Sequence, residues 1–138
     1  LWDSPEKAAE RMAFLLPYVD IIKLSVEELD MISHGRGTDF LFEKGVTLAL
    51  VTDGDKGATL CFKGEKAHIP AIKAKTVDTT GAGDIFLGTF VSEFIRKGKN
   101  LDELSLDDAI NFTKKAVFIS GKSTEKYGAI ASISDVII

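Results

Sequence analysis

Apolar runs of strand length alternate with capped helical segments along this chain, and this alternation constrains the fold more than any other feature. The run Val46–Thr52 is almost entirely aliphatic or β-branched, which is typical of a parallel strand buried on both faces. Shorter apolar runs predict strands at Ile21–Leu24 and Lys75–Val77 in the same sheet, and Ala58–Ile69 predicts a hairpin that extends it. We therefore predict one α/β domain over residues 1–138, with helices on both faces of a sheet.

Local signals mark where the helices start and stop. Ser4-Pro5-Glu6 places an N-cap residue before a proline at the first helical position. Ser25 followed three residues later by Glu28 is the pattern of a capping box. These signals and the apolar spacing predict helices at 5–16, 27–33, 38–44, 85–97 and 106–120.

The composition is that of an ordinary globular domain and argues against several classes of protein. The 138 residues carry a formal net charge of −4 and no basic run longer than Lys114-Lys115, so we expect neither a nucleic-acid nor a membrane partner. The single cysteine, Cys61, leaves no internal disulfide and fits a reducing compartment, so we expect a cytoplasmic protein with an unreactive thiol. His34 and His68 stand apart from other ligand-type residues, which argues against a zinc site.

A glycine-rich corner leads directly into the predicted helix over 85–97. Gly81 and Gly83 carry no side chains, so an anion could approach the bare amides at the helix start. Asp84 adds a carboxylate beside them, an arrangement that suits transfer of a phosphoryl group to a hydroxyl. The alternative is a tight turn followed by an acidic residue that only complements the helix dipole. The corner is neither a dinucleotide fingerprint nor a P-loop.

The sequence from Asp78 to Asp84, DTTGAGD, followed by IFLGTF, resembles the second signature of the ribokinase-like, PfkB-type carbohydrate kinases. This resemblance implies a three-layer α/β/α sandwich in which the C-terminal portion has a mainly parallel sheet. It implies that Gly81, Ala82 and Gly83 form an anion hole and that Asp84 is the base that deprotonates the sugar hydroxyl. It also implies a monovalent-cation site, suited to K⁺, bordered by Asp78 and Thr80.

The same resemblance implies a site for magnesium. Family members carry an Asn-x-x-Glu motif whose Glu helps to organise the magnesium shell, and Glu28 matches that residue. Ser25 stands where the family has Asn. A capping box and a carboxylate that reaches Mg²⁺ through water need the same corner, so both interpretations of Glu28 remain open.

Residues in two regions resemble the family's nucleotide site. The segment Thr52-x-Gly54-x-x-Gly57 is similar to the one that contacts the nucleotide phosphates, although by itself it predicts only a β-turn. Asn111, in a predicted helix, and Gly128, after it, are candidates for the adenine pocket. We therefore expect ATP and Mg²⁺ to bind, with K⁺ as a further ion.

Within the family, the chain looks most like the C-terminal half of a fructokinase. The implied function is ATP-dependent phosphorylation of fructose to fructose 6-phosphate, with a 2-keto-3-deoxygluconate kinase or another PfkB-type sugar kinase as the alternative. An alternative of another class is a non-catalytic fragment that binds nucleotide. The expected partners are a sugar and ATP, and a homodimer would form through the N-terminal lid that this chain lacks. We expect the chain to be inactive without the N-terminal half.

Overall fold

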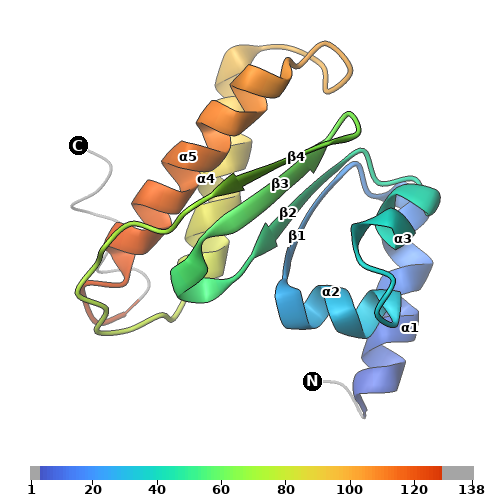
Figure 1. Cartoon of the computed structure of the whole chain (residues 1–138), viewed down its shortest axis with the longest axis horizontal. Helices are drawn as coiled ribbons and strands as arrows, with labels where there is room; N and C mark the ends of the chain where they lie inside the picture. Colours follow the sequence, from blue (N-terminus) through green and yellow to red (C-terminus); the bar gives the residue numbers. More distant parts are fainter. Residues whose placement is uncertain (1–3, 129–138) are drawn as a thin grey trace. The chain divides into compact units, whose positions relative to one another are not determined.

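The computed structural model describes residues 4–128. Within that range the chain divides into two compact units, residues 4–53 with 59–67 and residues 54–58 with 68–128. The expectation of a single domain over 1–138 stays a prediction. Helices and strands are both present, but they occur in groups and not in the regular alternation that the sequence predicts (Figure 1). None of the described helices is long and apolar enough to cross a membrane.

The first unit begins with helices whose ends follow the predicted signals. The Ser4 hydroxyl accepts the Lys7 amide at 3.2 Å and Pro5 is the first helical residue, so the predicted N-cap is confirmed. The second helix ends at Ser33 because His34 takes a left-handed conformation, with φ of 51°. The helical elements are α1 (Pro5–Leu15), η1 (Leu16–Tyr18), α2 (Val26–Ser33) and α3 (Thr38–Glu43).

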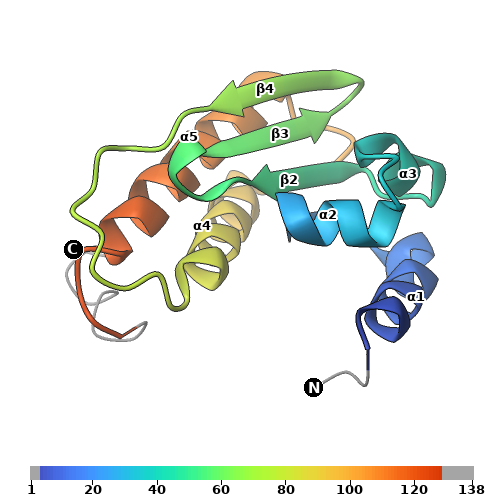
Figure 2. The same cartoon turned by 60° about the horizontal axis from the view of Figure 1, so that its bottom comes forward.

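A four-stranded sheet has the order β1 (Ile21–Ser25), β2 (Leu48–Thr52), β3 (Ala58–Phe62), β4 (Glu65–Ile69). β1 and β2 are parallel. In Figure 2 the arrow of β3 points opposite to those of β2 and β4. The sheet is therefore mixed, and the expectation of a mainly parallel sheet is wrong. The reason is connection length, because residues 53–57 and 63–64 are too short for a parallel crossover of about a dozen residues.

The core of the first unit forms where β1 and β2 meet α2 and α3. β2 is buried over its first four residues, which agrees with the nearly continuous apolar run in the sequence. The predicted hairpin is also confirmed as β3 and β4. The buried cluster comprises Leu16, Leu24, Leu29, Ile32, Phe40, Leu41, Val46, Ala49, Val51 and Cys61.

The second unit is built on two long helices that pack against each other, α4 (Ala82–Lys97) and α5 (Leu106–Ser123) (Figure 1). The rings of Phe90 and Phe112 meet edge to face with centroids 5.9 Å apart. Ion pairs join the same helices, from Lys97 to Asp108 at 2.8 Å and from Lys115 to Glu93 at 2.7 Å. α4 ends at Gly98, as predicted, whereas α5 runs three residues beyond its predicted end.

The predicted strand at Lys75–Val77 does not form. Its amides find their partners at the end of α5 instead of in a neighbouring strand. The Val77 amide donates to the Thr124 carbonyl at 2.7 Å, and the Lys75 amide donates to the Glu125 carboxylate at 3.4 Å. A backbone segment needs partners for its polar groups but not a particular kind of partner, and here a helix terminus supplies them.

Candidate active site

The glycine corner sits where the sequence predicts, at the start of α4. Gly81 is the N-cap residue with φ of 78°, a conformation that glycine adopts without the steric cost of a Cβ. Asp84 is the third residue of the helix. The corner is closed by hydrogen bonds from the Ala82 amide to the Thr79 carbonyl at 3.1 Å and from the Ile85 amide to the Gly81 carbonyl at 2.9 Å.

Three amides at this corner have no hydrogen-bond partner in the part of the chain that the structure describes, and we call them the open amides. Those of Gly81, Gly83 and Asp84 have no acceptor within residues 4–128, whereas the Ala82 amide is engaged by Thr79. They lie at the positive end of the α4 macrodipole, an arrangement that can bind an anion. Sequence reasoning did not count the Asp84 amide as a donor. The general rule that the first amides of a helix lack intrahelical partners could have predicted this third donor.

Asp78 links the corner to the segment after α5. One carboxylate oxygen accepts the Thr80 amide at 2.9 Å and the other accepts the Gly128 amide at 3.0 Å. Hydrogen bonds from Thr80 and then from the Gly128 amide lower the pKa of Asp78 below its ordinary value. The structure therefore brings together Asp78, Thr80 and Gly128, which the sequence assigned to two different sites.

The carboxyl ends of β1 and β2 bring together two other candidates. Ser25 lies opposite Thr52 in the parallel register, and the Thr52 hydroxyl donates to the Leu24 carbonyl at 3.3 Å. The Ser25 amide donates to Glu28 Oε2 at 2.7 Å, and the Glu28 amide donates to Ser25 Oγ at 3.2 Å. The capping box is confirmed, and it lies at the edge where parallel strands of α/β sheets bind their ligands.

The two glycines after β2 have different environments. Gly57 has φ of +109°, and a Cβ there would lie 2.1 Å from the Ile69 carbonyl oxygen and 2.6 Å from the Ala71 nitrogen. Close packing of backbone therefore requires glycine at 57. Gly54 also has a positive φ, +48°, but a Cβ there would meet no atom within 4 Å. Of the two, only Gly54 leaves open space beside the chain.

Asn111 lies apart from the cluster around Asp78. Its side chain is exposed on α5, and more than three helical turns separate it from Ser123, about 18 Å along the axis. The structure does not bring Asn111 next to Gly128, so their shared role at adenine stays a prediction. Across residues 4–128, no group of three or more His, Cys, Asp or Glu side chains is placed to hold a metal ion.

The fold is that of the ribokinase-like sugar kinases. The fructokinase of Xylella fastidiosa with bound ATP superposes with a TM-score of 0.86 at 22% identity, over 99% of this chain and 47% of that one. The chain belongs to the pfkB family of carbohydrate kinases, whose family model matches residues 1–135.

Two curated relatives illustrate the range of the family. Fructokinase-2 of Zea mays is 34% identical over 142 residues, which cover 99% of this chain and 42% of the relative. Ribokinase of Staphylococcus aureus (strain COL) is 36% identical over 128 residues, which cover 86% of this chain and 40% of the relative. The chain thus spans about 40% of the length of the curated relatives it matches.

Proposed function

We propose that this chain is the catalytic portion of an ATP-dependent sugar kinase that converts fructose to fructose 6-phosphate. The observation that carries the proposal is the corner of α4, where three amides without partners in residues 4–128 lie beside the Asp84 carboxylate. Membership of the pfkB family and the fructokinase relatives support this choice. Because another relative is a ribokinase, sugars other than fructose are also candidate substrates.

In this proposal the amides and the carboxylate of the corner have separate roles in the reaction. The open amides of Gly81, Gly83 and Asp84 stabilise the negative charge on the phosphoryl group during transfer. The Asp84 carboxylate accepts the proton of the sugar hydroxyl, which is too weak an acid to lose it unaided at neutral pH. General-base catalysis of this kind contributes about 10²- to 10⁴-fold in rate.

Two carboxylates are suited to hold the ions that the proposed reaction uses. Glu28 Oε2 accepts the hydrogen bond of the Ser25 amide. Glu28 Oε1 has no partner in the described chain and can accept a hydrogen bond from a water bound to Mg²⁺. Magnesium neutralises phosphate charge when it is bound. The Asp78 carboxylate is ionised at neutral pH, and the hydrogen bonds that lower its pKa keep it ionised to more acidic pH, so its charge would suit a K⁺ bound beside it. Thr52, Gly54 and Gly57 would contact the nucleotide phosphates.

The test is steady-state kinetics of Asp84→Asn in the full-length protein, with fructose, ribose and 2-keto-3-deoxygluconate as acceptors. We expect kcat to fall by about 10²- to 10⁴-fold with little change in ATP affinity, because the amide keeps the shape and the anion hole keeps its donors. Asp107→Asn is the matched control, since Asp107 is an exposed acid in the first turn of α5. It should leave kcat unchanged.

Two results would count against the proposal in different ways. If Asp84→Asn kept kcat within about threefold of the wild type, Asp84 would be a helix-cap residue and not the base. If the wild type bound ATP but phosphorylated none of the sugars, the non-catalytic alternative would be supported.

A further inference from the structure

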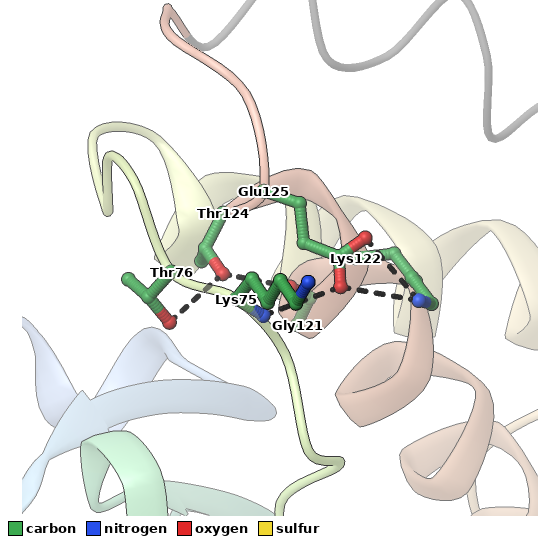
Figure 3. A network of polar contacts seen from close by, with 6 residues as sticks. All are labelled: Lys75, Thr76, Gly121, Lys122, Thr124 and Glu125. Atoms are coloured by element: carbon green, nitrogen blue, oxygen red, sulfur yellow. Dashed lines mark hydrogen bonds and ion pairs between the residues drawn. The ribbon is translucent and has the colours of Figure 1, made fainter.

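The segment before the glycine corner is held along the end of α5 by a polar network (Figure 3). We call residues 70–78 the strap. The Thr124 carbonyl accepts two strap amides, that of Val77 at 2.7 Å and that of Asp78 at 3.1 Å. Thr124 is only 8% exposed. The carbonyl of one buried residue therefore accepts the hydrogen bonds of the last two amides of the strap.

The Thr124 hydroxyl adds a second connection. It donates its single proton to the Gly121 carbonyl at 2.7 Å. The contact between the hydroxyls of Thr124 and Thr76, at 3.4 Å, must therefore use the Thr76 proton. In Figure 3 a dashed line joins the Thr76 hydroxyl, on the strap, to the Thr124 hydroxyl at the end of α5. The hydroxyl of Thr124 thus joins the helix to the strap with a defined direction of donation.

The hydrogen bonds that fix the strap continue into the glycine corner. Asp78, whose amide is bound by Thr124, accepts the Thr80 amide with its own carboxylate. Thr79 then accepts the Ala82 amide, which begins α4. Each residue from 77 to 80 thus takes part in a hydrogen bond that leads from the end of α5 to the open amides. A displacement of the strap would move those amides.

We propose that Thr124 is a positioning residue that holds the strap and thereby sets the direction of the open amides of Gly81, Gly83 and Asp84. The proposal rests on the proposed function of that corner. Positioning of this kind matters for transfer reactions, because a misplacement of about 1 Å can lower the rate by up to about 10²-fold.

The test compares Thr124→Val with Thr113→Val in the full-length protein. Thr113, in α5, is a matched control because it is buried like Thr124, the C-cap residue of that helix, and its hydroxyl also donates to a helix carbonyl, that of Ala109 at 2.7 Å. We expect kcat to fall by about tenfold or more in Thr124→Val with the KM for sugar little changed, and to stay unchanged in Thr113→Val. Thr124→Ser keeps the hydroxyl and should restore kcat.

Hydrogen exchange provides a measurement that does not depend on activity. Thr124→Val keeps the carbonyl that accepts the Val77 and Asp78 amides but loses the hydroxyl contacts with Gly121 and Thr76 that hold this carbonyl and the strap in place. Exchange of the Val77 and Asp78 amides should therefore speed up by roughly 3- to 10-fold in Thr124→Val, and less in Thr113→Val. Thr76→Val breaks the same hydroxyl contact from an exposed position and should show the same pattern if Thr124→Val does not fold.

Unchanged exchange at Val77 and Asp78, or an equal loss of kcat in the Thr124 and Thr113 variants, would overturn the proposal. A wild-type protein that phosphorylates no sugar would instead overturn the proposed function. In that case the exchange rates would still support or overturn the hold of Thr124 on the strap.

Discussion

At the scale of single residues, Gly57 shows how the structure changes the interpretation of a motif. Sequence reasoning grouped it with Gly54 as a nucleotide contact, but the backbone at Ile69 and Ala71 fills the space that a side chain would need. A glycine packed in this way is required by the fold whether or not a ligand binds nearby.

We expect Gly57→Ala to lower the free energy of unfolding by about 3 kcal/mol or more, because it combines a disfavoured φ with overlap against backbone atoms that cannot rotate away. Gly64→Ala is the control, since Gly64 has φ of +78° and a Cβ there would meet nothing within 4 Å. It should cost only about 1–2 kcal/mol. Urea unfolding of both variants measures the difference, and equal losses would contradict the packing argument.

Glu28 is the second residue whose role has to be separated experimentally. A glutamine also completes a capping box, so Glu28→Gln should leave the free energy of unfolding nearly unchanged. If the carboxylate also reaches Mg²⁺ through water, the variant should need more magnesium for half-maximal activity, because a neutral amide attracts the hydrated ion less. A magnesium titration decides this, and an unchanged midpoint would leave the cap as the role of Glu28.

At the scale of elements, helical glycines in α4 and α5 test how the strap packs. Alanine in place of an interior helical glycine usually adds about 0.5–1 kcal/mol of stability. Gly88→Ala should show this gain, since a Cβ there meets nothing within 4 Å. Gly121→Ala should lose it, because its Cβ would lie 2.6 Å from Cγ1 of Ile72 in the strap.

A double mutant tests whether position 121 packs against Ile72. In an Ile72→Ala background the obstacle is removed, and Gly121→Ala should become stabilising. Chemical denaturation of the four proteins in the cycle gives the coupling between the two residues. A gain from Gly121→Ala in the wild-type background would show that the strap does not pack on α5 as described.

At the scale of the whole molecule, several carboxylates connect stability to pH. Hydrogen bonds lower the pKa of Asp78, Asp108 and Glu125 below the ordinary values of 3.8 for Asp and 4.5 for Glu. A lowered folded-state pKa contributes stability that is present above the unfolded-state value and is lost as the pH falls through the folded-state value. We therefore expect the urea midpoint to decline as the pH drops below about 4.5.

Asp78→Asn should make that decline less steep, because asparagine does not titrate and so removes the carboxylate whose pKa Thr80 and Gly128 lower. Asp107→Asn is the control, since Asp107 is an exposed acid in the first turn of α5. The measurement is the unfolding midpoint as a function of pH for the wild type and both variants. Identical slopes in all three proteins would contradict the contribution of Asp78.

The sequence by itself determined the features that depend on neighbours along the chain. Ser4 and Ser25 cap their helices, Gly98 ends α4, and the hairpin forms where the apolar runs predict it. These features are local because a cap, a turn or a helical face involves residues only a few positions apart. The DTTGAGD corner identified the family for the same reason, since a helix start with bare amides is also local.

Only the tertiary structure decided which distant groups meet. The amides of Lys75 and Val77 could have joined a strand, but they bond to Glu125 and Thr124, about fifty residues away. The direction of β3 followed from the short connection after β2, and the need for glycine at 57 followed from backbone more than ten residues later. Backbone polar groups accept any partner with suitable geometry, so their choice is made by the packing of the whole unit and cannot be found from local patterns.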